Sequence, residues 1–483
     1  MLYKYIYKER KMKKISIFIV ALVMLLGCSN SKEKEKKEEL LAFPTAEGCG
    51  AKTKGGRGGV VYEVTNLNSS GKGSFREACE AKGSRVIIFK VGGTIDLKGK
   101  DIVINNDYIT IAGQTATGDG VQIKNGSLII RANEVIVRYL RIRTGEASSD
   151  ADAVTLSAPD RHHRKKNIIL DHISAFWGID EVVDAGSFND NVTVQWSIIA
   201  EGLNCAVYTD RGKGETWKPC KKLNNKSIWA HSRGIMVTED SRNITLHHNI
   251  IFRNYKRNPL IQSSDADIIN NVIVNYQYQA YIQPFKGRVR VNFIGNYFRS
   301  HIHKRPPIRV YDFNRGYDNQ SGVYYRDNYD KVFRPENNQS ETDIRLLQYS
   351  NKKDKDGHVQ DRNISYPFAK VKTQPVHKAY KLVLDKAGAI YPKRDIADQR
   401  VVNFIKSGKA PDSLVNTPKD VGGYPILIGG KAPKDSDHDG MPDSWEIKHG
   451  LNPNNPKDGN QKWLSDIGYT NLEVYLNSLV KGI

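Results

Sequence analysis

The chain has 483 residues, 39% of them hydrophobic, which allows one large domain or two to three ordinary ones with a sizeable core. Its formal net charge of +20 indicates an acidic partner, either nucleic acid or an acidic polysaccharide. No zinc-finger spacing or RNA-recognition motif is present, so we expect no nucleic acid partner. The 24 tyrosines and 40 glycines favour strands and turns over long helices.

The N-terminus has the features of an export signal. Three lysines precede an apolar run over residues 15–26, and a Leu-Leu-Gly-Cys sequence that resembles a lipobox ends at Cys28. The apolar run is shorter than the ~20 residues that span a bilayer. We therefore expect a lipoprotein signal peptide over residues 1–27 and lipidation at Cys28. The protein would be an exported lipoprotein of a Gram-negative envelope, at the outer membrane or cell surface, that touches the membrane only through its lipid anchor.

A charged tether over residues 28–41 follows, because the Lys- and Glu-rich stretch 32–39 has no apolar face. Four further cysteines occur beyond it, at Cys49, Cys79, Cys205 and Cys220, and three pairings are possible. Cys205 and Cys220 would close a local loop as a possible disulfide, and a Cys49–Cys79 bond is also plausible. Free buried thiols remain the alternative.

Seven short alternating segments recur through the centre of the chain, and most of their starts lie 22 to 33 residues apart. They begin at Tyr108, Val135, Ile168, Val192, Ile244, Ala266 and Val291. Each unit is too small to bury its own apolar face, so the units must stack as coils of a parallel β-helix. A β-sandwich is the weaker alternative. The repeat fades after about residue 300, and residues 334–375 are expected to be irregular.

Aligning the repeats places four polar residues in one column, and these are Ser197, Asn249, Asn271 and Asn296. Stacked asparagines would satisfy backbone groups at the turns by hydrogen bonding along the axis. The longest gap holds a loop over residues 201–225, where long insertions on a solenoid build a binding cleft. Trp217 in this loop would either stack on a sugar ring or pack the loop down.

Acidic residues occur at matching places on successive coils. Asp150 and Asp152 precede one coil, and Asp180 and Asp184 follow the next. Adjacent coils lie about 4.8 Å apart, so these carboxylates should converge and repel one another unless a cation lies between them. An all-oxygen ligand set suits Ca²⁺. The alternative is a solvated loop whose acids pair with nearby lysines.

Several motifs in order resemble polysaccharide lyase family 1, the pectate lyases, over residues 42–300. They are the Gly-rich segment 42–59, Val64-Thr-Asn-Leu-Asn, Gly73-Ser-Phe-Arg, Val91-Gly-Gly-Thr-Ile, Asp152-Ala-Val, Leu170-Asp-His, Asp184 and His247-His-Asn with Arg257-Asn-Pro. The resemblance implies an all-β, right-handed parallel β-helix with loop insertions over residues 42–431. It also implies calcium-dependent β-elimination of α-1,4-linked polygalacturonate to 4,5-unsaturated oligogalacturonates.

The same resemblance assigns site residues. Asp152, Asp180 and Asp184 would bind Ca²⁺ with Asp150 beside them, and Arg257 would be the catalytic base. Arg233 falls where the family often has a substrate-binding lysine, and Asp171 and His172 match a motif that is mainly structural. Gln262 stands where the family has a second arginine, which weakens one predicted contact to a substrate carboxylate. Arg253 and Lys256 are the neighbouring cations that could compensate.

The C-terminal segment 432–483 contains an acidic loop of the EF-hand type. Its ligand positions are Asp435, Asp437, Asp439, Met441 through its carbonyl, Asp443 and Glu446. Gly440 occupies the position that requires a sharp turn. We expect a small cap, clipped by Ca²⁺, that hides an edge of the solenoid.

Three other functions fit parts of this pattern. A pectin lyase acting on methyl-esterified polymer would not need the retained acidic cluster. A polygalacturonase would need paired catalytic carboxylates and would leave Arg257 unexplained. A non-catalytic glycan-binding β-helix is made more credible by Gln262. We expect the protein to be a monomer.

Overall fold

The structure is a computed structural model, and it describes residues 39–147, 151–205, 231–284, 287–300, 305–311, 321–333, 347–349, 360–361 and 364–480. The predicted signal peptide and Cys28 lie outside these residues. Residues 41–483 form one compact unit. Among the described residues, no helix is both long enough and apolar enough to cross a bilayer.

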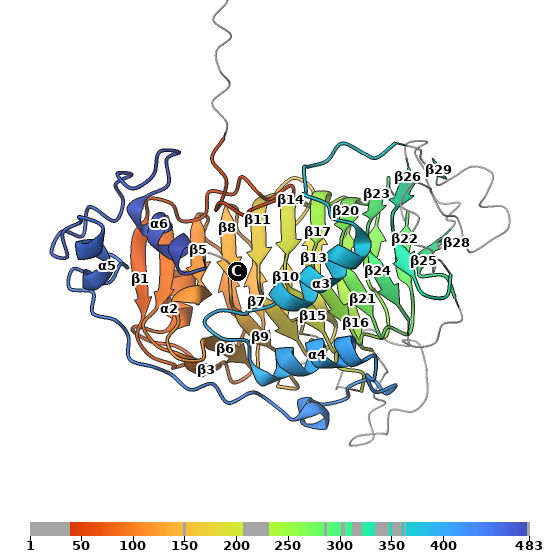
Figure 1. The fold of residues 1–483 in the computed structure, drawn as a ribbon, viewed down its shortest axis with the longest axis horizontal. Coiled ribbons are helices and arrows are strands. Elements are labelled where there is room, and N and C mark those ends of the chain that lie inside the picture. Colours follow the sequence, from red (N-terminus) through yellow and green to blue (C-terminus); the bar gives the residue numbers. More distant parts are fainter. Residues whose placement is uncertain are drawn as a thin grey trace, which may run out of the picture. The chain divides into compact units, whose positions relative to one another are not determined.

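Three parallel sheets, here called A, B and C, form the body of this unit (Figure 1). Sheet A contains β1 (Val60–Val64), β2 (Arg85–Phe89), β5 (Ile109–Ala112), β8 (Val135–Arg138), β11 (Lys165–Asp171), β14 (Asn189–Gln195), β17 (Arg242–His247), β20 (Asp265–Ile269), β23 (Arg290–Ile294), β26 (Gly322–Arg326) and β29 (Gln360–Asp361). Sheet B contains β3 (Gly93–Asp96), β6 (Val121–Lys124), β9 (Arg141–Arg143), β12 (Ser174–Phe176), β15 (Ile198–Ala200), β18 (Ile250–Phe252), β21 (Val272–Val274), β24 (Tyr297–Arg299) and β27 (Tyr329–Asp330). Sheet C contains β4 (Ile102–Ile104), β7 (Leu128–Ile130), β10 (Val154–Leu156), β13 (Glu181–Ser187), β16 (Arg233–Thr238), β19 (Leu260–Gln262), β22 (Ala280–Gln283), β25 (Ile308–Val310) and β28 (Leu347–Tyr349).

Each coil gives one strand to each sheet, so strands that are neighbours in space are one coil apart in the sequence. In sheet A, Val135 pairs with Ile168, which pairs in turn with Val192, and all three side chains are fully buried. Rows of this kind fill the interior of the coils with aliphatic side chains. The predicted parallel β-helix is confirmed, and the β-sandwich alternative is excluded because every strand pair formed by the described residues is parallel.

The predicted polar column is confirmed at the turn between sheets A and B. The Oδ1 atom of Asn249 accepts the backbone N–H of Ser197 at 2.9 Å, and Asn271 and Asn296 repeat this contact on the following coils. Asn328 adds a fifth member, because its Oδ1 accepts the N–H of Asn296 at 2.9 Å. The column therefore satisfies buried backbone groups along the axis.

The sequence predicted that the repeat fades after about residue 300, but the structure shows that the coils continue beyond it. Strands β25 to β29 add further coils, and Asn328 belongs to one of them. From residue 364 the chain forms no further coil strands but runs back along the outside of the solenoid (Figure 1). Residues 42–431 are thus a β-helix followed by a returning segment.

The returning segment carries the helices α3 (Val376–Lys386) and α4 (Ile396–Ser407) and the short 3₁₀ helix η4 (Pro418–Val421). α3 and α4 pack on the outer face of sheet B, where Val383 and Val402 join a buried cluster with Phe176 and Phe252. Arg143 adds a buried ion pair to Asp395 at 2.7 Å.

The outer face of sheet A is covered by two other segments. Phe43 and its neighbours pack on Ile136 and Ile169, and a Cβ at Gly50 would lie 2.5 Å from the carbonyl oxygen of Ile168. Only glycine allows this segment to lie so close to the sheet. The C-terminal tail, with α5 (Asp443–Lys448) and α6 (Asn471–Ser478), packs through Leu472 on sheet A.

The end of the solenoid is closed by α2 (Phe75–Glu80), whose buried Phe75 and Cys79 join the central core. The short 3₁₀ helix η1 (Gly113–Thr115) lies in the connection between β5 and β6. The tail packs on the outer face of sheet A and also contacts β1, the terminal strand of that sheet, where Nδ1 of His438 lies 2.9 Å from Glu63. The expectation that it hides an edge of the solenoid stays a prediction. None of the buried hydrophobic clusters formed by the described residues covers the outer face of sheet C.

The cysteines follow two different patterns. Cys49 and Cys79 are free thiols, so the plausible bond between them is not formed. Cys205 is disulfide-bonded. Cys220 and Trp217 lie outside the described residues, so the Cys205–Cys220 pairing and the role of Trp217 stay predictions.

Candidate active site

A tight turn before β13 brings acidic residues of two coils together. A Cβ at Gly178 would lie 1.9 Å from the carbonyl oxygen of Glu181, so the turn requires glycine there. The backbone N–H of Glu181 donates to Oδ1 of Asp152 at 2.8 Å, and the Thr155 hydroxyl donates to Oδ2 at 2.8 Å. Asp152 is therefore fixed by two donors at the start of β10.

Three carboxylates converge at this turn, and they belong to Asp152, Asp180 and Glu181. One oxygen from each lies within 4.8 Å of the others. Burial and the carboxylates of Asp184 and Asp180 raise the pKa of Asp152 well above its ordinary value. Carboxylates that repel one another so closely form the hard oxygen set that Ca²⁺ prefers, so this donor set fits a calcium ion.

Asp184 lies at the edge of this group and is not one of the three converging residues. It is paired in register with Thr155, and its Oδ1 accepts the N–H of Gly186 at 2.8 Å. Burial, with the nearby charges of Asp180 and Glu239, raises the pKa of Asp184 to about 7. Asp150 lies outside the described residues.

Arg257 reaches the acidic group from two coils further along the chain. Its guanidinium forms an ion pair with Glu181, which is only 2% exposed, and its Nη1 donates to the sulfur of Met236 at 2.8 Å. Burial lowers the pKa of Arg257, while the charges of Asp180 and Asp152 act to raise it. A half-buried arginine beside three carboxylates is thus the central feature of the outer face of sheet C.

Local backbone contacts hold Arg257 in place. It has a left-handed backbone conformation with φ of 59°, which is uncommon for a residue with a side chain. Its carbonyl accepts the N–H of Ile235 at 2.8 Å, and a Cβ at Gly234 would lie 2.6 Å from that same oxygen. Gly234 therefore allows the turn that carries Arg257 to lie close to β16.

His231 and Arg233 form a second contact beside Asp180. Nδ1 of His231 donates to the carbonyl of Ile179 at 2.9 Å, so its Nε2 is free to accept the Arg233 Nε–H at 2.7 Å. Burial and the Arg233 charge lower the pKa of His231 to about 4. His231 is neutral near pH 7, so its 3.3 Å contact with Asp180 is not an ion pair.

The other three predicted substrate contacts, Lys256, Gln262 and Arg253, lie in different places. Lys256 lies near Arg233, and its ammonium packs over the ring of Tyr278 at 5.3 Å. Gln262 ends β19, and its amide donates to Gln283 at 3.2 Å. Gln262 also lines a cavity of about 460 Å³ together with Arg161 and Glu239.

Arg253 is not at the site. It is 4% exposed, and its guanidinium contacts Glu201 at 3.4 Å and donates to the carbonyl of Ser413 at 2.7 Å. The prediction that it compensates for Gln262 is therefore wrong, because its charge is buried and already paired.

Asp171 and His172 also lie in a buried network on sheet A. Oδ2 of Asp171 accepts Nε–H of Arg138 at 2.8 Å, and Nδ1 of His172 lies 2.8 Å from Oδ1. This position agrees with the structural role expected for the pair. The network has no part in the acidic group of sheet C.

The C-terminal loop brings together most, but not all, of its predicted ligands. Asp435, Asp437 and Asp439 form one group of converging oxygens, and Asp439, Glu446 and Asp458 form another. Gly440 has φ of 96°, as the predicted sharp turn requires. Met441 is buried after it, whereas Asp443 points away and pairs with Lys434 at 2.9 Å.

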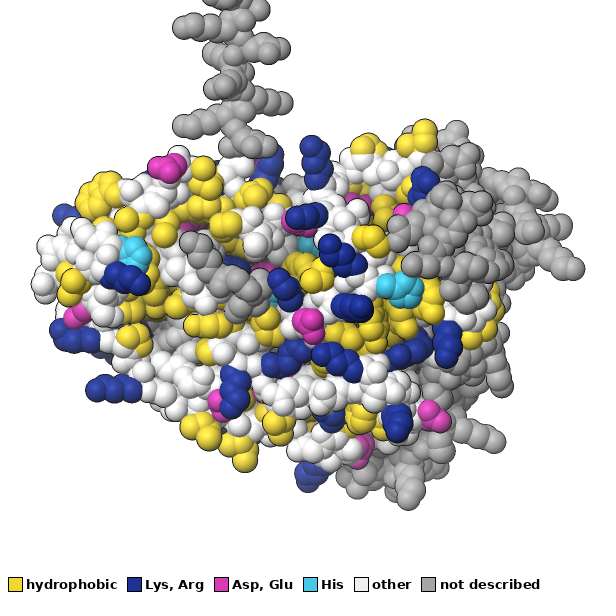
Figure 2. All heavy atoms as spheres, in the orientation of Figure 1, with side chains coloured by type: hydrophobic (Ala, Val, Ile, Leu, Met, Phe, Trp, Pro, Cys, Tyr) yellow, Lys and Arg dark blue, Asp and Glu magenta, His cyan; other side chains and the backbone are white. Residues whose placement is uncertain are grey.

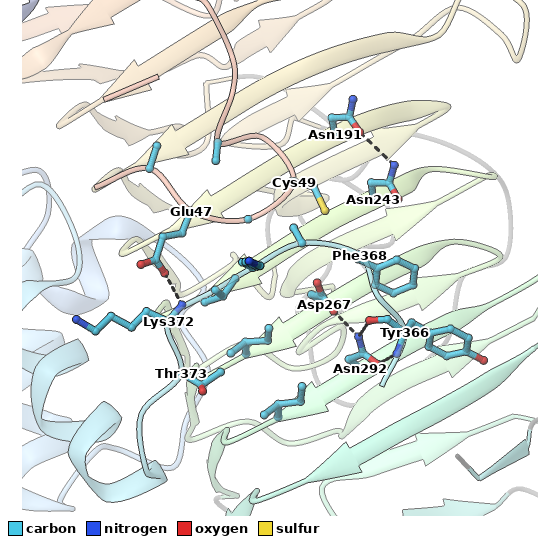
Figure 3. Close-up of a pocket in the computed structure, with 18 of the residues that line it drawn as sticks. Glu47, Cys49, Asn191, Asn243, Asp267, Asn292, Tyr366, Phe368, Lys372 and Thr373 are labelled. Carbon is cyan, nitrogen blue, oxygen red and sulfur yellow. Dashed lines mark hydrogen bonds between the residues drawn. The ribbon is translucent and has the colours of Figure 1, made fainter. Parts of the chain in front are cut away.

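Other cavities and charged surfaces lie away from the acidic group. A cavity of about 890 Å³ on sheet A is lined by Glu47, Cys49, Asp267 and Lys372 (Figure 3). Figure 2 shows Lys and Arg side chains spread over the face that carries α3 and α4. Positive charge is thus widespread on this face, whereas the acidic group of sheet C combines converging carboxylates with an arginine in direct contact.

The sequence did not identify Glu181 or His231 as site residues. Glu181 directly follows Asp180, so the only available signal was a second acid at the same turn. His231 lies two residues before Arg233. The side-chain directions at these turns depend on how the coils stack, which the sequence pattern does not give.

No protein-family model matches the chain. The chain is 33% identical over 465 residues to a probable pectate lyase C of Aspergillus terreus, an alignment that covers 95% of this chain and 98% of the relative. It is 35% identical over 445 residues to a probable pectate lyase C of Aspergillus oryzae, covering 91% and 94%. The crystal structure of the major cedar pollen allergen aligns with a TM-score of 0.46 and 17% identity, over 71% of this chain and 92% of that one.

Proposed function

The chain belongs to the pectate lyase family, and from this premise we propose that the outer face of sheet C cleaves polygalacturonate by β-elimination at Arg257. The protein is a polysaccharide lyase. The observation that carries the residue assignment is the contact of Arg257 with the buried Glu181, which belongs to an acidic group from the preceding coils. A pectin lyase, which acts without calcium, would not need that group.

Arg257 takes the C5 proton of a galacturonate unit at a guanidinium nitrogen. The electron pair of that C–H bond forms the C4=C5 double bond, the C4–O bond breaks, and the departing oxygen takes a proton from water. Only the neutral guanidine can accept the proton, so burial that lowers the pKa of Arg257 favours the reaction. Activity should therefore rise at alkaline pH.

Glu181 positions Arg257, because it is the first residue of β13, its backbone N–H is bound to Asp152, and its carboxylate lies against the guanidinium. Asp152, Asp180 and Glu181 would hold Ca²⁺, with Asp184 at the edge of the group. When bound there, the ion supplies positive charge that stabilises the carboxylate of the reacting sugar. Arg233, held by His231, is available to bind a substrate carboxylate.

The charge that Gln262 lacks is supplied by Arg161. Both residues line the same cavity, and the exposed Arg161 comes from the loop after β10. An arginine in this position can bind a carboxylate through two N–H groups. Arg161 and Lys256 thus add positive charge to the surface that we propose binds the substrate.

The location of the protein rests on its sequence alone. We infer export through residues 1–27, lipidation of Cys28 and a tether over residues 28–41, with the folded part acting as a monomer at a Gram-negative envelope. Metabolic labelling with a palmitate analogue tests the anchor, since Cys28→Ser should abolish the label. Light scattering of the protein without its anchor tests the monomer.

One assay tests the reaction. The protein is incubated with polygalacturonate and Ca²⁺, then with chelator, while the absorbance of the unsaturated product is followed. We expect absorbance only with calcium and polygalacturonate. New reducing ends without that absorbance would indicate hydrolysis, and methyl-esterified polymer cleaved in chelator would indicate a pectin lyase. Binding without any product would indicate a non-catalytic glycan-binding protein.

A further inference from the structure

Four acidic side chains in the C-terminal tail have carboxylate oxygens that accept no hydrogen bond. These oxygens are Oδ2 of Asp437, Oδ2 of Asp439, Oδ1 of Asp458 and both oxygens of Glu446. Glu446 is fully buried, and Asp458 and Asp439 are 1% and 4% exposed. Buried carboxylates without partners are strongly unfavourable when charged, and a cation among them would remove that cost.

The hydrogen bonds of the same residues direct these oxygens to one point. The second oxygen of Asp439 accepts the N–H of Met441 at 2.9 Å, and that of Asp458 accepts the N–H of Asn452 at 3.1 Å. In both residues one oxygen is held by the backbone and the other is left facing the acidic group. Asp439 belongs to both converging groups, which makes them two halves of one cage.

Gly459 leaves the space that an ion would occupy. A Cβ at this position would lie 2.5 Å from the unpaired Oδ2 of Asp439. Because Gly459 has no side chain, the space next to Oδ2 of Asp439 is not filled by protein atoms. The unpaired oxygens can therefore reach an ion there, although their residues are buried.

We propose that the tail binds one Ca²⁺ through Asp435, Asp437, Asp439, Glu446 and Asp458. Asp458 takes the place of Asp443, the residue that the EF-hand spacing predicts as a ligand. Five carboxylates supply the hard oxygen ligands of a calcium site. Asp443 is excluded because it belongs to neither converging group and its oxygens accept from Ser436 and Lys434. Asp435 belongs to the first group, although its oxygens also accept the N–H groups of His438 and Gly440 and Oδ2 pairs with Lys90.

Because Asp458 lies outside the loop 435–446, an ion bound by this ligand set would connect that loop to another segment of the tail. Asp458 lies in the segment that leads to α6, and its carbonyl accepts Nδ2–H of Asn471 at 2.9 Å. The neighbouring Gly459 carbonyl accepts the N–H of Leu472, whose side chain packs on sheet A. The ion would thus join the segments that carry α5 and α6, and α6 packs on the solenoid (Figure 1).

Calcium binding by the full-length protein, measured by titration calorimetry after chelator treatment, tests the ligand set. Asp458→Asn and Glu446→Gln should each weaken one calcium site by at least about tenfold. Asp443→Asn and Asp466→Asn should leave the number and affinity of sites within twofold of the wild type. Asp466 is an exposed acid of the same tail and serves as the matched control.

A second measurement separates loss of a ligand from loss of folding. In chelator, Asp458→Asn removes one of five repelling charges, so the tail should resist trypsin at the exposed Lys462 at least as well as the wild type does. With calcium, only the wild type and the Asp443 and Asp466 variants should gain protection. Unchanged calcium affinity in Asp458→Asn, or a lost site in Asp443→Asn, would overturn the proposal.

Discussion

The guanidinium of Arg257 lies against the carboxylate of Glu181, although the two residues belong to coils two turns apart. Glu181 in turn belongs to a group of three carboxylates with Asp152 and Asp180. The contact joins the proposed base to the proposed calcium site. The predictions for Arg257 and Glu181 below depend on this contact.

Arg257→Lys should lower the initial rate of unsaturated product formation by at least about 100-fold, since general-base catalysis contributes about 10²–10⁴. Lysine keeps the charge but not the planar fork that reaches both Glu181 and the substrate. Circular dichroism should show an unchanged fold. Arg242→Lys, a change at a partly exposed arginine outside the acidic group, is the control, and full activity of Arg257→Lys would remove Arg257 from the mechanism.

Glu181→Gln should raise the calcium concentration needed for half-maximal activity by about 10–100-fold, because it removes one charged member of the acidic group. The rate at saturating calcium should also fall, since Arg257 loses its positioning partner. Calcium titrations of activity measure both effects. Glu239→Gln makes the same chemical change outside the three converging residues and should leave the calcium requirement nearly unchanged; equal behaviour of the two variants would contradict the assignment.

Arg161→Ala should raise KM for polygalacturonate severalfold with little change in kcat, because a residue that contacts bound sugar away from the reacting carbon contributes uniform binding. Gln262→Arg should lower KM and should partly restore binding to Arg161→Ala. Steady-state kinetics at two salt concentrations check this, since loss of a cation also weakens the salt dependence. Independent effects of the two changes would argue against a shared role for the cavity.

Asp267→Asn should stabilise the protein above neutral pH. Burial raises the pKa of Asp267 from 3.8 to about 7, so the folded state keeps a proton that the unfolded state releases between these values. The wild type therefore loses stability as pH rises through this window, at about 1.4 kcal/mol per unit of pKa difference at most.

The variant should match the wild type below pH 4 and exceed its free energy of unfolding above pH 7. Asparagine can still accept the Nδ2–H of Asn292, which now donates to Asp267 at 2.6 Å. Urea denaturation at several pH values measures the difference. Asp466→Asn should show no such pH dependence, and a variant that is less stable at pH 8 would refute the buried neutral acid.

Asn249→Ala should destabilise the solenoid. The side chain accepts the N–H of Ser197 and donates to the carbonyl of Val194 at 2.8 Å, and alanine would leave both buried groups unpaired. Each such group costs about 1–3 kcal/mol. Thermal unfolding should show a clear decrease, whereas Asn403→Ala on the exposed face of α4 should change little; equal stability of the two variants would mean that the column is not a source of stability.

Much of the fold could be predicted because a solenoid repeats one local pattern. The segment around Asn249 gives a short strand, a polar turn residue and a second strand, and the neighbouring coils do the same. Residues at equal positions must then stack, so the contact of Asn249 with Asn271 follows from register alone. The acids at Asp152 and Asp180 follow from the same rule.

Side-chain direction at irregular turns was decided only by the tertiary structure. Asp180, Glu181 and Asp184 are neighbours in sequence, yet the turn at Gly178 directs the first two toward Asp152 and leaves Asp184 at the edge. Arg253 and Arg257 look alike in sequence, but one is buried against Glu201 and the other reaches the acidic group.

The sequence by itself determined the coil repeat, the polar column and the approximate position of the proposed site residues, because these depend on period and register. Only the tertiary structure shows which side chains contact each other between coils, and which residues of the tail contact its acidic loop. Glu181 lies beside Arg257, and Asp458 joins a loop that ends at Glu446, because packing brings together residues whose separation follows no fixed period. Insertions of variable length between coils remove that information from the sequence pattern.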